Sequence, residues 1–257
     1  MSSHKPKKHL GQNFLTDPRT QRRIVDACGL NNDDRVVEIG PGQGAMTRLI
    51  APKVRRLICV ETDKDLIGRL KEEFKNSNVE IAHADFLRWP IPIGVKVIGN
   101  IPYYISTPII EKLIEERAKV TDAYLTVQME FGQRLAAAAG SDDYGALSCF
   151  AQYYADVKVL FKIKSTCFNP KPKVDSCFVH LNFKKDKYRP KDEAKMFHFI
   201  RTVFTQRRKN ILNAASILVE KNKLTSILNE LNISPDIRPE ELNLDNFIAI
   251  SDKLQVE

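Results

Sequence analysis

The sequence predicts an α/β fold with a parallel sheet, followed by a small all-helical C-terminal domain. Two observations predict the sheet: short apolar strands alternate with helical segments, and a glycine-rich loop joins the first strand to the next helix. A third observation predicts the helical domain, because strand patterns stop at about Pro190. We place the boundary in the charged stretch Lys184–Pro190 and expect domains over 1–187 and 188–257.

The expected strands are short apolar runs that are bounded by turn residues. They lie at Arg35–Ile39, Arg56–Val60, Val79–Ala82, Val95–Ile98 and Ala123–Val127, and the alternating segments Val157–Ile163 and Cys177–Phe183 are expected to form a late hairpin.

The expected helices have apolar residues at helical spacing or a terminal signal. Pro52 ends the first helix, and Ser106 or Thr107 is expected to cap the third, with Pro108 in its first turn. In the main domain we expect helices over 45–51, 64–74, 106–118, 130–139 and 145–154; in the C-terminal domain we expect helices over 191–204, 210–220, 224–231 and 240–254.

Composition excludes several broad classes of protein. Of the 257 residues, 43% are hydrophobic and 28% are charged, which is ordinary for a soluble globular protein and excludes global disorder. No run of eighteen apolar residues is present, so we expect no membrane contact. The basic start, Met1 to His9, lacks an apolar core behind it and is not expected to be a signal peptide.

The cysteines and histidines predict neither a metal site nor a disulfide framework. The 5 cysteines include no C-x-x-C pair, and the 5 histidines show no metal-ligand spacing. We therefore expect no metal and a reducing, cytoplasmic location. Nothing in the sequence demands more than a monomer.

Positive charge is concentrated in two segments. The net charge is +8, and basic and acidic residues are equal in number from Pro190 onward, so the earlier residues hold the surplus. One basic segment is residues 1–23 and the other is residues 158–191. Two such segments favour a polyanionic partner, nucleic acid first, over an ordinary solvated surface rich in lysine.

A glycine-rich loop follows the first predicted strand. Its sequence is Glu38-Ile-Gly40-Pro-Gly42-Gln-Gly44, in which glycines allow a tight turn and close approach to a ligand. The spacing differs from the dinucleotide fingerprint, and no G-K-[ST] of a P-loop follows. The loop is similar to that of class I S-adenosylmethionine methyltransferases, in which an acid at the strand end can hold the ammonium of the methionine moiety.

Two further acids follow the next two predicted strands. Glu61 can accept both ribose hydroxyls of a nucleoside, and Asp85 can accept the exocyclic amine of an adenine. Each acid alone is also explained as a helix cap or a solvated strand end. Together with the loop they predict a nucleoside cofactor, because open α/β sheets bind ligands at this edge.

The segment Asn100-Ile-Pro-Tyr103 follows the fourth predicted strand. It resembles the (Asn/Asp)-x-Pro-(Tyr/Phe) motif of methyltransferases that act on exocyclic base nitrogens. The N6 lone pair of adenine is delocalised into the ring, so a carbonyl that accepts the N–H protons makes the nitrogen a better nucleophile. An aromatic ring can stack on the flipped base. A plain turn with a packed tyrosine is the alternative.

Taken together, these motifs resemble the ribosomal small-subunit adenine dimethyltransferases, the family whose loss gives kasugamycin resistance. The resemblance covers nearly the whole chain. The motifs that carry it are 11–15, 38–42, 100–103 with 106–108, 144–148, 168–176 and 204–209.

This resemblance implies a Rossmann-like methyltransferase sheet and the cofactor S-adenosyl-L-methionine. It implies dimethylation of the N6 amines of two adjacent adenines near the 3′ end of small-subunit rRNA, on the small ribosomal subunit or its precursor, with an assembly role alongside. The implied cofactor residues are Asn13, Leu15, Glu38, Gly40, Gly42, Glu61, Asp85 and Asn100, and the implied catalytic residues are Asn100, Tyr103 and Phe168.

By the same resemblance, Phe168 would close on the target adenine opposite Tyr103. Tyr104 and Met129 depart from the family pattern, which often has asparagine and lysine there, but neither removes a reacting group. Two alternatives stay open: a sister family that methylates one large-subunit adenine and confers macrolide resistance, and a relative that binds nucleic acid without turnover. The segment 204–209 and the stretch 145–148 favour the small-subunit family.

Overall fold

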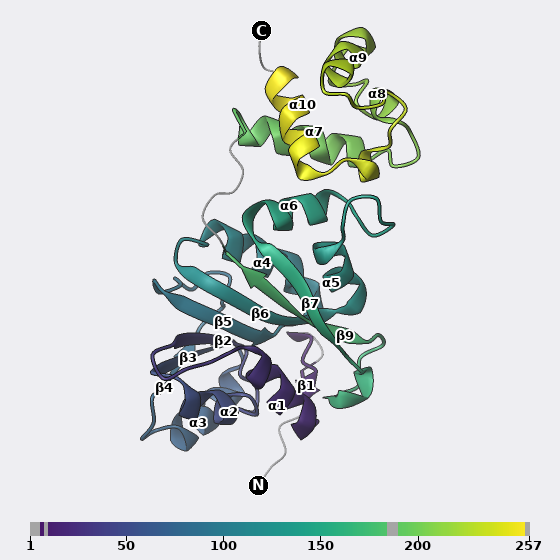
Figure 1. Cartoon of the computed structure of the whole chain (residues 1–257). Helices are drawn as coiled ribbons and strands as arrows, with labels where there is room; N and C mark the ends of the chain where they lie inside the picture. Colours follow the sequence, from purple (N-terminus) through teal and green to yellow (C-terminus); the bar gives the residue numbers. More distant parts are fainter. Residues whose placement is uncertain (1–5, 8–9, 184–189, 255–257) are drawn as a thin grey trace. The chain divides into compact units, whose positions relative to one another are not determined.

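The structure is a computed structural model that describes residues 6–7, 10–183 and 190–254. It divides into two compact units (Figure 1). Unit 1 comprises Met1–Gly132 and Ala155–Phe183, and unit 2 comprises Gln133–Tyr154 and Lys184–Glu257. The domain boundary expected at 187/188 lies outside the described residues.

Unit 1 contains a seven-stranded sheet in the order β4-β3-β2-β5-β6-β9-β7. The first five of these strands are parallel, and β9 lies antiparallel between β6 and β7. Their bounds are β2 Arg35–Ile39, β3 Arg56–Glu61, β4 Val79–His83, β5 Val95–Asn100, β6 Val120–Gln128, β7 Asp156–Ile163 and β9 Ser176–Asn182. Every strand expected from the sequence is present, and the late hairpin is the β7–β9 pair.

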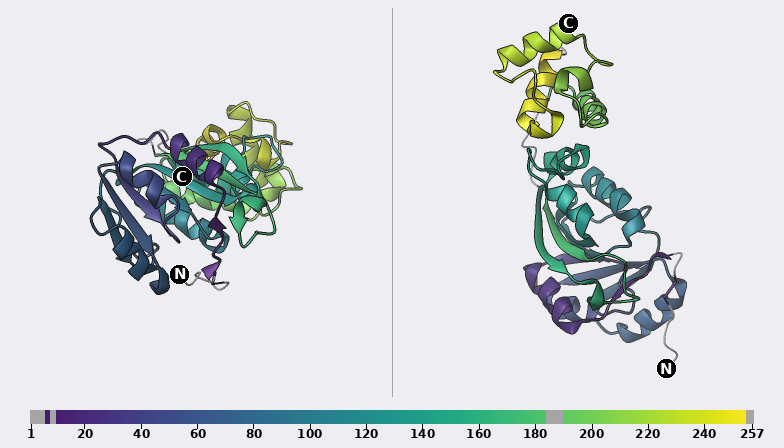
Figure 2. Two further views of the ribbon diagram at one scale, coloured as in Figure 1. Left: turned by 90° about the horizontal axis from the view of Figure 1, so that it is seen from below. Right: turned by 90° about the vertical axis from the view of Figure 1, so that its right-hand side faces the viewer.

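Helices cover both faces of this sheet (Figure 2). The buried side chains of strands and helices form its core, as when Ile24 of α1 and Ile50 of α2 join Val36 and Leu57. The helices are α1 Pro18–Ala27, α2 Thr47–Ile50, α3 Lys64–Glu73 and α4 Ser106–Glu115, with 3-10 turns η2 Ala51–Lys53, η3 Tyr103–Ile105 and η4 Ser165–Cys167. Helix α5 Met129–Ala136 begins in unit 1 and ends in unit 2. A separate two-stranded sheet pairs β1 Phe14–Leu15 with β8 Phe168–Asn169.

Helices α1, α2 and α4 of unit 1 differ from the sequence-based expectations. Helix α1 was not expected, although Asp17 caps it by accepting from the Thr20 amide at 2.8 Å. Helix α2 is shorter than expected, because the preceding residues form the turns of the glycine-rich loop. The N-cap of α4 is Ile105 without a side-chain bond, and the buried hydroxyl of Ser106 finds no partner among the described residues.

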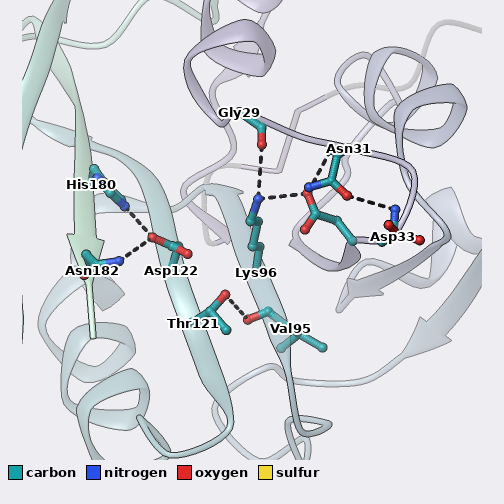
Figure 3. A network of polar contacts seen from close by, with 10 residues as sticks. Gly29, Asn31, Asp33, Val95, Lys96, Thr121, Asp122, His180 and Asn182 are labelled. Carbon is teal, nitrogen blue, oxygen red and sulfur yellow. Dashed lines mark hydrogen bonds and ion pairs between the residues drawn. The ribbon is translucent and has the colours of Figure 1, made fainter. Parts of the chain in front are cut away.

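A polar network lies at the amino edge of the parallel strands (Figure 3). The Lys96 Nζ of β5 donates to Asp34 Oδ2 at 2.8 Å and to the Gly29 carbonyl at 3.1 Å. In β6, Asp122 Oδ1 accepts from Asn182 at 2.8 Å and lies 2.8 Å from the His180 Nε2 of β9. These contacts join β5 to the segment before β2, and β6 to β9, at the amino edge of the sheet.

Unit 2 is helical and has its own core. It contains α6 Ala146–Tyr154, α7 Glu193–Phe204, α8 Ile211–Ala214, α9 Lys221–Glu230, η5 Pro239–Glu241 and α10 Leu244–Leu254. Tyr144 and Cys149 are buried in one cluster with Ile200 and Phe247, which explains why Gln133–Tyr154 belongs to this unit. Helix α8 ends far before the expected residue 220, because Ile217 and Leu218 beyond it are exposed and find no core.

Candidate active site

A cavity of about 350 Å³ lies at the carboxyl edge of the parallel strands. The ends of β2, β3 and β5 and the loop after β4 contribute Gly40, Glu61, Asn100 and Asp85 to its wall. The opposite wall is the chain segment Leu10–Phe14. This volume is within the usual range for a small-molecule site, and the edge is where open α/β sheets bind ligands.

A second cavity, of about 220 Å³, adjoins the first. Phe14, Gly40, Gly42 and Asn100 line both cavities, so the two cavities are neighbours at one edge of the sheet. Glu38 and Leu15 line only the second. A hollow of about 590 Å³ elsewhere in unit 1 is lined by Arg35, Arg55 and Arg56 among others, and none of the predicted site residues lines it.

The glycine-rich loop requires glycine at both shared positions. Gly40 has φ +62° and Gly42 has φ +58°, in the left-handed region that side chains disfavour. A Cβ on Gly42 would lie 2.9 Å from Cε1 of Phe14, whereas a Cβ on Gly40 would meet open space. The backbone at Gly40 therefore leaves room for a ligand to approach closely.

Glu38 is a fully buried carboxyl on β2. Its Oε2 accepts from the Thr47 hydroxyl at 2.7 Å and lies 3.5 Å from the Cys59 sulfur on the neighbouring strand. Its Oε1 has no partner among the described residues. Burial raises the pKa of Glu38 to about 7. An unpartnered carboxyl oxygen beside a cavity fits a cationic group such as an ammonium.

Glu61, at the end of β3, lines the larger cavity and is 6% exposed. Its two oxygens accept from the Gly42 amide at 3.1 Å and the Asp63 amide at 2.8 Å. Burial raises the pKa of Glu61, although these backbone hydrogen bonds oppose the rise. The two hydrogen bonds from backbone amides fix the carboxylate beside the cavity, where it can accept hydrogen bonds from hydroxyl groups.

Asp85, after β4, is exposed and lines the larger cavity. Its Oδ1 accepts from the Leu87 amide at 3.0 Å. This local hydrogen bond fits the alternative that Asp85 is only a solvated strand end. The side chain nevertheless also lines the cavity.

Asn100, the last residue of β5, lies where the two cavities meet. Its Nδ2 donates to the Asn13 carbonyl at 2.8 Å. Because a carbonyl can only accept, this contact fixes the orientation of the Asn100 amide and directs Oδ1 elsewhere. Among the described residues, none hydrogen-bonds to that Oδ1. Asn13 in turn donates from its side chain to the Gly11 carbonyl at 3.2 Å.

Tyr103 lines the larger cavity and is held by its hydroxyl. The hydroxyl oxygen lies 2.7 Å from that of Ser176, the fully buried first residue of β9. Burial raises the pKa of Tyr103, so the phenol stays neutral. The neighbouring Tyr104, which the sequence marks as a departure from the family, is 63% exposed and lines the same cavity.

The structure does not bring Phe168 to either cavity. Phe168 is 4% exposed, belongs to the core of unit 1 and pairs with Leu15 across the β1–β8 sheet. The other predicted site residues, Asn13, Leu15, Glu38, Gly40, Gly42, Glu61, Asp85, Asn100 and Tyr103, all line one or both cavities.

Sequence reasoning missed Phe14 and Asp63. Phe14 lines both cavities, and its place inside the Gly11–Leu15 motif was the available signal. Asp63 contacts Glu61 through its backbone, as described above, and only its position two residues after that acid hinted at a role.

Among the described residues, no group of three or more His, Cys, Asp or Glu could hold a metal ion. In the same part of the chain, no helix has both the length and the apolar character that crossing a membrane requires.

Comparisons with known proteins agree with this architecture. A sequence profile described as Ribosomal RNA adenine dimethylase matches residues 3–255. The Ribosomal RNA small subunit methyltransferase A of Mycoplasma mobile is 40% identical over 247 residues, which cover 95% of this chain and 96% of the relative. The protein of the same name from Fusobacterium nucleatum is 38% identical over 256 residues, 96% of each.

Two solved structures are similar over nearly the whole chain. A dimethyladenosine transferase from Plasmodium falciparum has a TM-score of 0.79 at 25% identity, with 92% of this chain and 95% of that chain covered. The 23S rRNA methyltransferase ErmE has a TM-score of 0.76 at 25% identity, with 94% and 99% covered. Because the profile spans nearly all of the sequence and close relatives match it end to end, the chain belongs to the ribosomal RNA adenine dimethylase family.

Proposed function

We propose that this chain catalyses S-adenosyl-L-methionine-dependent dimethylation of the N6 amines of two adjacent adenines near the 3′ end of small-subunit rRNA. Its substrate is the small ribosomal subunit or its precursor. Family membership and relatives named for the small subunit support this proposal. The observation that carries it is Asn100, an oriented amide at the junction of the two cavities.

The residues of the two cavities fit S-adenosyl-L-methionine. Glu38 would offer its unpartnered carboxyl oxygen to the ammonium, while Asn13 lines the larger cavity and Leu15 the smaller one. Glu61 accepts from the ribose hydroxyls, and Asp85 accepts from the adenine amine. When bound, the cofactor supplies a methyl group on a positively charged sulfur that leaves readily.

Asn100 and Tyr103 prepare the target amine. The free Oδ1 of Asn100 would accept a hydrogen bond from the N6 amine, which would localise the nitrogen lone pair and make it a better nucleophile. The Tyr103 ring, held by Ser176, stacks on the flipped base. No side-chain base is needed, because water can take the proton after transfer. The stacking role of Phe168 stays a prediction, since its ring is buried.

The direct test offers labelled S-adenosylmethionine to small subunits that lack the modification and maps the labelled bases. We expect label on two adjacent adenines. In single-turnover assays, Asn100→Ala should slow transfer by about a hundredfold or more, because it removes an acceptor that matters most in the transition state. Exposed Asn76→Ala is the matched control. Wild-type rates in Asn100→Ala would overturn the acceptor assignment.

The similarity to ErmE supports a second candidate function, methylation of a single adenine of large-subunit rRNA. The same assay with large subunits separates the two, because label on large-subunit RNA alone would favour that candidate. A protein that only binds RNA need not retain S-adenosylmethionine, which equilibrium dialysis measures.

A further inference from the structure

The N-terminal arm, defined here as residues 6–7 and 10–15, is fastened to the rest of unit 1 at Asp63. Asp63 Oδ1 accepts from Lys7 Nζ at 2.5 Å, and its Oδ2 accepts from Gln12 Nε2 at 2.8 Å. Lys7 Nζ also lies 2.6 Å from Asp65 Oδ2, and the Lys7 amide donates to Gln12 Oε1 at 2.8 Å. Four polar contacts therefore connect Lys7 and Gln12 of the arm with each other and with Asp63 and Asp65.

Asp63 also belongs to the framework of the cofactor cavity. Its side chain is fully buried, and it caps helix α3 by accepting from the Asp65 amide at 3.1 Å. Its own amide donates to Glu61 Oε1 at 2.8 Å. Asp63 thus contacts the arm through its side-chain carboxylate and contacts Glu61 through its backbone amide.

The arm itself forms one wall of the larger cavity. Leu10 to Phe14 line it, and the Asn13 carbonyl accepts a hydrogen bond from the side-chain amide of Asn100. The Phe14 ring packs against the apolar cluster of α3 and over Gly42. If the arm moved, the cavity would lose a wall, and Asn100 would lose the bond that orients it.

We propose that Asp63 is a positioning residue that holds the arm as a wall of the cofactor cavity, through its bonds to Lys7 and Gln12. This rests on the proposed function, because it takes the cavity to hold S-adenosylmethionine. In this arrangement Lys7 is an internal ion-pair partner, although its place in a basic segment suggested a phosphate contact. The contacts hold both groups ionised. The Asp63 and Asp65 hydrogen bonds raise the pKa of Lys7, and for Asp63 the bonds from Lys7 and Gln12 outweigh burial and lower the pKa.

The test compares Lys7→Met with Lys71→Met in the full-length protein. Lys71 is an exposed lysine of α3 with no ion pair among the described residues, so the charge change is matched. We expect Lys7→Met to speed cofactor release by about threefold to tenfold, since it removes charged hydrogen bonds that are partly exposed. Hydrogen exchange over residues 10–14 should rise in the same variant. Lys71→Met should change neither quantity.

A second variant separates positioning from folding. Asp63→Asn keeps a good N-cap for α3 but loses the charge, so it should weaken cofactor binding with little change in unfolding free energy. Because both variants break the Lys7–Asp63 contact, the effect of the double variant should be smaller than the sum of the two single effects.

Three results would overturn the proposal: unchanged release and exchange in Lys7→Met, additive effects in the double variant, or weaker binding of ribosomal particles as the sole defect. If the wild-type protein binds no S-adenosylmethionine, the proposed function fails instead. Hydrogen exchange over residues 10–14 in the cofactor-free protein would then still decide whether Asp63 holds the arm.

Discussion

At the residue scale, Glu38 is a carboxyl group whose ionisation is unfavourable in the folded protein without a ligand. A fully buried carboxyl with one unpartnered oxygen is costly to ionise, and its pKa of about 7 expresses that cost. The unfolded chain would ionise the same group near 4.5. The folded protein therefore binds this proton more tightly than the unfolded chain does. Its stabilising effect is complete below pH 4.5 and is lost as the pH rises to about 7.

We predict that Glu38→Gln gains stability relative to wild type as the pH rises from 4.5 to above 7. The shift corresponds to about 3 kcal/mol, because each pKa unit is worth about 1.4 kcal/mol. Urea unfolding without cofactor at pH 5 and pH 8, followed by the fluorescence of Trp89 in unit 1, measures the difference. Titrating groups that do not interact with Glu38 are common to both proteins and cancel. Parallel pH profiles for the two proteins would show that Glu38 does not titrate in this range.

The same substitution should weaken cofactor binding. A bound ammonium favours the ionised form of Glu38, so wild-type affinity should rise between about pH 6 and 7, whereas Glu38→Gln should show no such rise. Calorimetric titration at both pH values measures this. A flat wild-type profile would remove Glu38 from the ammonium site.

Among the elements of the fold, the seven strands of the main sheet were predictable because each is a short apolar run or an alternating segment. Helix α1 was not predicted, because all five residues after Pro18, from Arg19 to Arg23, are polar or charged. The Asp17 cap before Pro18 was the available signal. Strands β1 and β8 have two residues each, too few for any periodic pattern. Their pairing depends on tertiary packing, and that packing places Phe168 in the core.

Phe168 in strand β8 carries the element-scale prediction. Phe168→Ala should lower the unfolding free energy by about 3–5 kcal/mol, because it leaves a cavity in the core of unit 1. Phe168→Leu should cost less, about 1.5 kcal/mol, since most of the volume is kept. Urea denaturation measures both.

Methyl transfer by Phe168→Leu then tests the stacking role on a folded protein. If the ring stacks on the target adenine, as the family resemblance implies, this variant should be slower by about tenfold. Near-normal transfer would leave Phe168 as a core residue that supports Leu15 and the arm.

The site was predictable to the extent that its residues stand at strand ends. Glu61 and Asn100 end β3 and β5, so their convergence follows from the parallel sheet. The contacts of Lys7 and Gln12 with Asp63 join residues more than fifty positions apart through a loop that has no sequence pattern. No spacing rule could have found them.

Over the whole molecule, the basic segments separate into paired and unpaired charges. Lys7 is paired with Asp63, and Lys162 with Asp175 at 2.8 Å. Lys5, Lys8 and residues 184–189 lie outside the described part of the chain. Lys171 and Lys173 are exposed in the segment after β8, and within the described residues neither forms an ion pair. A charge without an internal partner is free to bind a phosphate.

We therefore predict that Lys171 and Lys173 contribute to particle binding through phosphate contacts. Binding should weaken steeply with salt, because each contact releases counterions from the RNA. Neutralising both lysines should flatten the log–log salt slope by roughly one unit per lost contact. The control is the double variant of Lys71 and Lys75, two exposed lysines in and just after α3 that change the net charge equally. Equal slopes in the two double variants would mean that net charge alone attracts the RNA, whereas a smaller slope only for Lys171 and Lys173 would place the phosphate backbone at that segment.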